Sequence, residues 1–232
     1  MSTTPLTLAP NLAKALGIKN RLYLKREDLH PFGSHKGRSI PVMIETYLKK
    51  GGHDFVISSS GNAALAAALY TKKYNQKNKK QPINLQILVG KNIEPEKLKS
   101  IKKLLNKNIL LTQTENPKQT AFQIEKNTNA IWLRQSTDDT ALVGYETLAK
   151  ELAKVKNLQA VFIPTSSGTT AEGLYLGFKK LKLKPQLHII QTTACHPFVV
   201  GDINTAASLA GAIVDKVARR KQNVLKIIKQ TK

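Results

Sequence analysis

The sequence is short of several residue types, and each shortage narrows the possible functions. Its single cysteine, Cys195, rules out an internal disulfide and fits a reducing compartment, so we expect a cytoplasmic protein. No apolar run approaches the roughly 18 residues that a membrane span needs, and the N-terminus lacks the basic start and apolar core of a secretory signal. The five histidines show no metal-ligand spacing, so we expect no metal site.

Acidic residues are also scarce, with 15 Asp and Glu against 37 Lys and Arg and a formal net charge of +22. This balance makes nucleic acid one candidate partner. The lysines, however, occur along the whole chain, and in 96–108 they fill the polar positions of an amphipathic helix. Aromatic RNA-binding signatures and zinc-finger spacing are absent. We therefore interpret the charge as a solvated surface and rank a nucleic-acid-binding protein last among the alternatives.

From residue 54 onward the sequence alternates strand and helix patterns. Short apolar runs predict strands at 54–60, 83–90, 108–113, 130–136, 158–166 and 186–193. Helical patterns follow them at 62–74, 94–106, 117–127, 144–155, 169–182 and 204–220. Such alternation is typical of βαβ units and predicts the α/β class with mainly parallel sheets.

One strand of this pattern leads into the segment PTSSGTTAEG (164–173), which is a candidate phosphate loop. Ligands in α/β sheets bind beyond the carboxyl ends of strands, where loops enter helices. Backbone N–H groups at a helix start attract anions, and hydroxyl side chains add donors. The candidate residues are Ser166, Ser167, Gly168, Thr169 and Thr170. The motifs GxxxxGK[ST] and GxGxxG are absent, and an ordinary turn capped by a hydroxyl is an equally good interpretation of this segment alone.

A second strand leads into SSSGNAALAAA (58–68). Ser59, Ser60 and the neighbouring N–H groups are candidates for binding a carboxylate. Asn62 either caps the following helix or forms a hydrogen bond with a ligand. The segment alone does not distinguish these two roles.

The third candidate is Lys36, which follows a loop containing proline and glycine in LKREDLHPFGSHKGRS (24–39). An enclosed lysine amine forms Schiff bases, and a lowered pKa lets it act as a base. In a chain this rich in lysine, a single lysine carries little weight without its context.

That context comes from four blocks, LYLKREDLHPFGSHKGR, SSSGN, GYETLAKEL (144–152) and IPTSSGTTAEG. In order and approximate spacing they resemble the tryptophan synthase β-like family of pyridoxal-phosphate enzymes, which includes threonine synthase, cysteine synthase and threonine ammonia-lyase. The resemblance covers essentially the whole chain. It implies pyridoxal 5'-phosphate as cofactor and two interleaved three-layer α/β/α domains. The smaller would span 38–142 and carry the SSSGN loop, and the larger, cofactor-binding domain would comprise 1–37 and 143–232.

The resemblance also implies residue roles and a reaction. Lys36 would carry the cofactor as a Schiff base, and Asn62 would lie beside its ring. Ser166, Ser167, Gly168, Thr169 and Thr170 would hold the phosphate, and Ser59, Ser60 and Gly61 would receive the substrate carboxylate. The implied reaction is elimination or replacement at the β or γ carbon of a small amino acid, as in threonine synthase or threonine ammonia-lyase.

The chain departs from the family pattern in two respects. Ser166 and Thr169 stand where glycines are common. Relatives continue past the point where this chain ends, so we expect an incomplete larger domain, exposed apolar surface near its C-terminal end, and a homodimer or a partner that completes it. The alternative to an active enzyme is a catalytically incomplete, cofactor-binding or regulatory homologue.

Overall fold

The computed structural model describes residues 3–199 and 208–231. The strands are β1 (Leu6–Leu8), β2 (Tyr23–Lys25), β3 (Asp54–Ser58), β4 (Asn84–Gly90), β5 (Ile109–Thr114), β6 (Ile131–Trp132), β7 (Ala160–Pro164) and β8 (Gln186–Ile190). The helices are α1 (Pro10–Ala15), α2 (Lys36–Leu48), α3 (Asn62–Lys77), α4 (Pro95–Lys102), α5 (Pro117–Asn127), α6 (Thr140–Val143), α7 (Glu146–Leu152), α8 (Thr169–Lys180) and α9 (Lys221–Gln230), with a short 3-10 helix, η1 (Glu27–Leu29).

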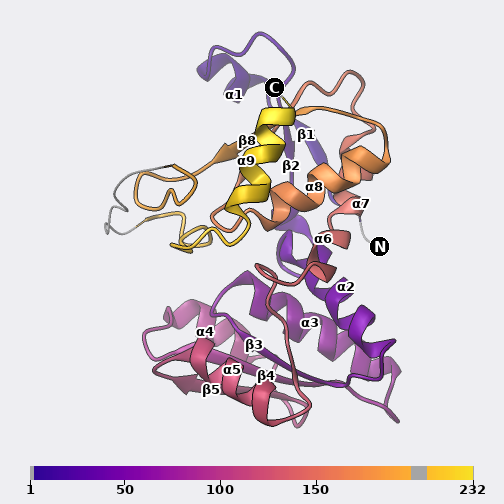
Figure 1. The fold of residues 1–232 in the computed structure, drawn as a ribbon, viewed down its shortest axis with the longest axis vertical. Helices are drawn as coiled ribbons and strands as arrows, with labels where there is room; N and C mark the ends of the chain where they lie inside the picture. The colour runs from indigo at the N-terminus through magenta and orange to yellow at the C-terminus, as the bar shows by residue number, and fades with distance from the viewer. Residues whose placement is uncertain (1–2, 200–207, 232) are drawn as a thin grey trace.

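Figure 1 shows two parts of the molecule, with α2 and α6 at the joint between them. The lower part holds a parallel sheet in the order β5-β4-β3-β6. In its centre Phe55 pairs with Leu85 of β4 on one side and with Ile131 of β6 on the other. The upper part holds the parallel pair β7-β8 and the antiparallel pair β1-β2. The predicted α/β class with mainly parallel sheets is therefore confirmed.

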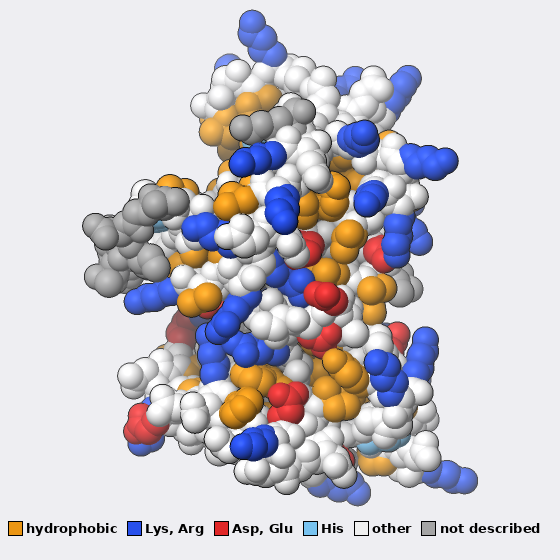
Figure 2. All heavy atoms as spheres, viewed as in Figure 1, with side chains coloured by type: hydrophobic (Ala, Val, Ile, Leu, Met, Phe, Trp, Pro, Cys, Tyr) orange, Lys and Arg blue, Asp and Glu red, His pale blue; other side chains and the backbone are white. Residues whose placement is uncertain are grey.

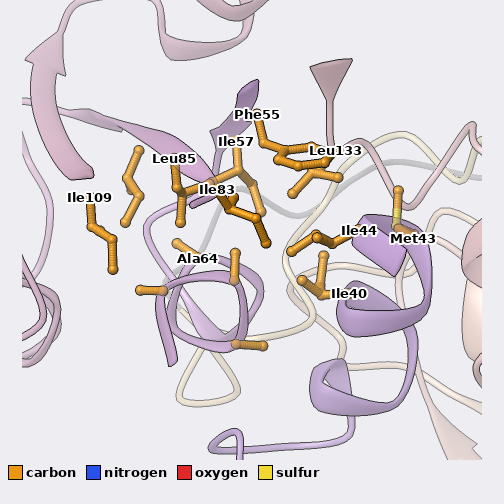
Figure 3. Packing of buried hydrophobic residues seen from close by; sticks show 14 of the residues in the cluster. Ile40, Met43, Ile44, Phe55, Ile57, Ala64, Ile83, Leu85, Ile109 and Leu133 are labelled. Atoms are coloured by element: carbon orange, nitrogen blue, oxygen red, sulfur yellow. The ribbon is translucent and has the colours of Figure 1, made fainter. Parts of the chain in front are cut away.

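Helices cover both faces of the lower sheet. Alternate side chains of a strand point to opposite faces, so Phe55 and Ile57 pack with α2 and α3 while Val56 packs with Ala121 of α5. In Figure 3, Ile44 of α2 points toward the sheet near Leu133. This arrangement gives the lower part three layers, with a buried cluster on each face of the sheet.

Only one face of the upper parallel sheet is covered by elements that the structure describes. Ile163 and Leu187 pack with α7, α8 and α9. On the opposite face Phe162 is 54% exposed and Ile190 is 43% exposed, and the Phe162 ring stacks on His188 with centroids 4.6 Å apart. Parallel sheets are normally covered on both faces. Here, in contrast, the second face is an exposed apolar surface.

The buried residues form three clusters: two lie on the two faces of the lower sheet, within residues 40–141, and the third is drawn from residues 145–227. These clusters are compatible with the expected division, but the domain boundaries at 38–142 stay a prediction. None of the helices in the described ranges is long and apolar enough to cross a bilayer.

One predicted helix is wrong. Residues 204–207 of the helix expected at 204–220 lie outside the described residues, and residues 208–220 contain no helix. The last helix is α9, which buries Val224 and Ile227. In residues 208–220, tertiary contacts outweigh the local helical pattern. The Asp215 N–H donates to Ser166 Oγ at 3.3 Å, and Arg220 forms ion pairs.

A second difference is α2 itself, since no helix was expected before residue 54. Gly37, Ser39 and Pro41 all lie inside it and obscure its helical pattern. Burial of Ile40 and Ile44 against the lower sheet supplies the stability that propensity does not.

An ion network fixes α2 in the joint. The Arg38 side chain is 2% exposed; its Nη2 lies 2.8 Å from Glu27 Oε1, and its Nη1 lies 2.5 Å from Glu151 Oε1 of α7. Lys25 Nζ pairs with Glu151 Oε2 at 2.5 Å, and Thr4 Oγ1 accepts a hydrogen bond from Arg38. Two cations and two carboxylates thus neutralise one another where η1, α2 and α7 meet.

Arg38→Met tests the weight of this network. Removing one member of a buried ion pair leaves its partners uncompensated and costs about 3–5 kcal/mol. We expect a loss of that size in the free energy of unfolding, measured by urea denaturation. Arg26→Met is the matched control, because Arg26 pairs with the exposed Asp28 and its loss should have a much smaller effect. Equal losses of unfolding free energy in the two variants would contradict the proposed contribution of Arg38 to stability.

The same network predicts how stability depends on pH. Burial raises the pKa of Glu151, but hydrogen bonds from Arg38 and Lys25 outweigh burial and lower that pKa to about 2. In the unfolded chain the pKa is about 4.3. The stabilisation is therefore complete above about pH 5 and is lost as pH falls toward 2.

Glu151→Gln should reduce the loss of folding stability at acid pH. We expect the wild type to lose on the order of 1–2 kcal/mol more than Glu151→Gln between pH 5 and 2, after allowance for solvent screening. Urea denaturation at several pH values measures the difference. Parallel curves for the two proteins would show that Glu151 does not carry the dependence.

Candidate active site

Lys36 is the first residue of α2, and a tight loop fixes its position. Its backbone N–H donates to Ser34 Oγ at 3.2 Å, and Gly33 has φ +83°, a conformation that favours glycine. A Cβ on Gly37 would lie 2.2 Å from His30 Nδ1, so this position also requires glycine. Lys36 is half-buried, and its amine forms no ion pair with a carboxylate of the described residues.

The two histidines beside Lys36 are neutral at neutral pH. Burial, together with the charge of Lys36, lowers the pKa of His35 to about 3. Burial and the charge of Arg38 also lower the pKa of His30, whose Nδ1 accepts the Phe32 N–H at 3.1 Å. Neither imidazole adds a positive charge near the amine.

The SSSGN loop joins β3 to α3, and Asn62 is the first residue of α3. Asn62 does not cap the helix; Ser59 Oγ instead accepts the Gly61 N–H at 3.3 Å. Within the described ranges the Asn62 amide has no hydrogen-bond partner. The capping alternative is therefore not observed, and the amide is free for a ligand.

The loop before Lys36 packs on the first turn of α3. A Cβ on Gly33 would lie 2.8 Å from Leu65 Cδ2, and Leu65 is three residues after Asn62. The helix starts that carry Lys36 and Asn62 are therefore held together by direct packing.

Ser60 lines a cleft of about 440 Å³ at the carboxyl ends of β3, β4 and β5. The other lining residues are Gly90, Lys91, Asn92, Ile93 and Glu115. Ligands of α/β proteins bind at this edge of a sheet. The cleft is open beside the loop in which a substrate carboxylate was expected.

The candidate phosphate loop joins β7 to α8. Gly168 has φ +87° and precedes the first residue of α8. Thr165 Oγ1 accepts the Gly168 N–H at 3.1 Å, and the hydroxyls of Ser167 and Thr169 lie 3.1 Å apart. The N–H groups of Thr170 and of the next residue have no acceptor among the described residues. The start of α8 therefore presents unsatisfied donors, as an anion site requires.

Ser166 and Thr169, which stand where the resemblance implies glycines, are bonded to protein groups. Ser166 Oγ accepts the Asp215 N–H at 3.3 Å, and Thr169 Oγ1 donates to Gln135 O at 3.4 Å. Both residues are buried. Thr170, which follows them, is buried as well.

Gln135, which sequence reasoning missed, connects this loop to α2. Its Nε2 donates to Ser39 Oγ, one turn after Lys36, and its backbone oxygen accepts the bond from Thr169. Both Ser39 and Gln135 are buried. The position of Gln135 in the sequence could have indicated this role. It follows the carboxyl end of β6, and α/β proteins place ligand-binding groups at that edge of the sheet.

The GYETLAKEL block packs between α2 and α8. A Cβ on Gly144 would lie 2.2 Å from Arg38 O, so only glycine permits this approach. Tyr145 is fully buried and lies against the His35 ring with centroids 6.3 Å apart. A Cβ on Gly173 of α8 would lie 2.8 Å from Tyr145 Cδ2. Tyr145 therefore separates the two helices at a fixed distance.

These groups fit pyridoxal phosphate. The cofactor needs an amine for its aldehyde, an anion site for its phosphate and polar contacts at its ring. The chain offers the Lys36 amine, the unsatisfied N–H groups at α8 and the unpaired amide of Asn62. No group of His, Cys, Asp and Glu in the described ranges has the arrangement of a metal site.

Comparisons with known proteins agree with this geometry. The family model described as "Pyridoxal-phosphate dependent enzyme" matches residues 1–231. The threonine synthase of Methanosarcina acetivorans is 26% identical over 192 residues, which cover 78% of this chain and 44% of that protein. A biosynthetic threonine dehydratase of Solanum lycopersicum is 27% identical over 81% of this chain and 30% of its own length.

Solved structures show the same fold. A fungal L-serine ammonia-lyase from Rhizomucor miehei aligns over 99% of this chain and 73% of its own, with 21% identity and a TM-score of 0.78. The processed threonine deaminase isoform 2 from Solanum lycopersicum aligns over 84% of this chain and 55% of its own, with 21% identity and a TM-score of 0.71. The incomplete larger domain expected from the sequence agrees with these partial coverages.

The chain spans about half, or less, of the length of the curated relatives it matches. The family match nevertheless covers nearly every residue, and the cofactor predicted from the four blocks is the cofactor of that family. The chain belongs to the pyridoxal-phosphate dependent enzymes, in the group with the tryptophan synthase β-like fold.

Proposed function

We propose that this protein is a lyase or synthase that eliminates or replaces a group at the β or γ carbon of a small amino acid, with Lys36 as its point of cofactor attachment. The observation that carries the proposal is the Lys36 amine, half-buried, without a carboxylate partner in the described residues, and tied through Ser39 and Gln135 to the start of α8. The relatives named threonine synthase and threonine dehydratase support the reaction class.

Lys36 has the chemical role in the proposed reaction. When bound, pyridoxal phosphate supplies an electron-poor ring that stabilises negative charge on a substrate carbon. Lys36 Nζ holds the cofactor and, as a free amine, moves a proton at the substrate Cα. The ring of His35 is neutral and adds no positive charge beside the amine.

The remaining groups bind and orient the cofactor and the substrate. The loop of Ser166, Ser167, Gly168, Thr169 and Thr170 holds the phosphate through backbone N–H groups and hydroxyls. Asn62 would bind the cofactor ring through its free amide, and Ser59, Ser60 and Gly61 would receive the substrate carboxylate beside the cleft that Ser60 lines. The proposed location is the cytoplasm.

A catalytically incomplete cofactor-binding or regulatory homologue is the second candidate. One observation favours it: the sheet face with Phe162 and Ile190 is exposed. The same face supports the proposed association with a second copy or a partner chain. Nucleic-acid binding has less support, because Figure 2 shows Lys and Arg spread over both parts of the visible face instead of gathered in one stripe.

Borohydride labelling tests the attachment. Protein mixed with pyridoxal phosphate and reduced with borohydride should carry one cofactor mass on the peptide that contains Lys36, read by mass spectrometry. Lys36→Ala should abolish the label, whereas Lys49→Ala, which removes an exposed lysine at the end of the same helix, should leave it unchanged. A label on another lysine, or none, would refute the role of Lys36. With the label present, turnover of serine, threonine, homoserine phosphate or acetylserine supports the enzyme, and no turnover supports the second candidate.

Asn62→Ala tests the amide. Losing one hydrogen bond to the ring costs about 1 kcal/mol, so the dissociation constant for pyridoxal phosphate should rise about fivefold. Fluorescence titration measures this, and labelling at Lys36 should persist. Asn78→Ala, at the other end of α3 where the amide bonds only to Tyr74 O, is the control. An unchanged constant for Asn62→Ala would remove Asn62 from the site.

A further inference from the structure

Arg220 is a buried cation beside the start of α8, and we propose that it binds the phosphate held by the loop of residues 165–170. The identification of that phosphate as the cofactor's rests on the proposed function. The site itself follows from the contacts of Arg220, which no sequence block indicated.

The side chain of Arg220 crosses the loop at Gly168. Arg220 is 7% exposed and immediately precedes α9. Its backbone N–H donates to Ser167 O at 3.4 Å, and its Cβ lies 3.4 Å from the position that a Cβ on Gly168 would occupy. The absence of a side chain on Gly168 allows this approach. The first carbons of Arg220 therefore lie directly on the loop.

The guanidinium has four partners and one unsatisfied nitrogen. Nη1 lies 2.8 Å from Asp139 Oδ1 and 3.1 Å from Glu172 Oε2. Nη2 donates to Asp138 O at 3.0 Å and to Gln135 O at 3.4 Å. Nε is buried and has no partner among the described residues. A buried N–H without an acceptor is unfavourable, so a ligand acceptor is expected at Nε.

Donors outnumber acceptors around this nitrogen. Gln135 O receives both the Arg220 bond and the Thr169 hydroxyl, each at 3.4 Å. The N–H groups of Thr170 and Ala171 also lack acceptors in the part of the chain that the structure describes. A phosphate offers several acceptor oxygens and negative charge, and so satisfies these donors together.

The two carboxylates at Arg220 have different roles. Glu172 is buried and is also held by Asn223 Nδ2 at 2.8 Å, so it fixes the direction of the guanidinium. The Asp139 side chain is 83% exposed. Water screens its charge, and it competes with a bound anion for the same guanidinium. Removing the Asp139 charge should therefore strengthen anion binding.

Inorganic phosphate is the probe, because it needs no reaction with an amine. Isothermal titration of the full chain should show phosphate binding that Arg220→Met weakens about 10- to 100-fold, as expected for a charge-assisted hydrogen bond. Arg219→Met removes the same charge from the exposed neighbouring residue and should change the affinity less than about twofold. Asp139→Asn should raise the affinity about two- to fivefold.

Several outcomes overturn the inference: no phosphate binding by the wild type, or equal affinities for Arg220→Met and Arg219→Met. If Arg220→Met fails to fold, an unchanged or weaker affinity in Asp139→Asn overturns it. Lys36→Ala separates it from the proposed function, because that variant should bind phosphate as the wild type does. Phosphate binding that depends on Arg220, with no borohydride label on Lys36, supports the inference and refutes the attachment.

Discussion

The pairing of Arg38 with Glu27 and Glu151 is the constraint on which the rest of the molecule depends. It fixes α2 between the two parts, and Lys36 lies two residues before Arg38 on the same helix. The buried guanidinium is compensated by carboxylates from η1 and α7, so each of these elements has one favourable position relative to α2. The approach of Gly144 to Arg38 O fixes the same contact sterically. The place of the amine is therefore set by long-range contacts and not by its loop alone.

The same helix couples the core to the site. Its middle residues, Ile40 and Ile44, are fully buried against the lower sheet, while its first turn faces the joint. Ser39 lies between these regions and bonds to Gln135, whose backbone reaches Thr169. A short buried chain of hydrogen bonds thus connects α2 to the anion loop. Glycines stand where α2, α7 and α8 meet because a Cβ at Gly144 or Gly173 would clash with the facing element.

The upper part leaves one surface without a cover. Phe162 and Ile190 face outward from a two-stranded parallel sheet, although such sheets are normally enclosed by two layers. The structural relatives extend beyond the aligned region. The groups that bind the cofactor in our proposal lie on the opposite side, at the joint and at the start of α8. In our proposal, cofactor binding and association through this face therefore use different surfaces of the molecule.

The sequence by itself determined the α/β class, since alternating apolar patterns report strands and helices locally. It also located the candidate groups at strand ends, and the order of four blocks identified the family and cofactor. Tertiary structure alone decided the rest. Arg38 and Glu151 are 113 residues apart, and Arg220 and Glu172 are 48 apart, so no local pattern marks them as pairs. The prediction of a helix at 204–220 was wrong, and α2 was not predicted, for the same physical reason. Burial and ion pairing between distant segments outweigh the propensities that a short stretch of sequence expresses.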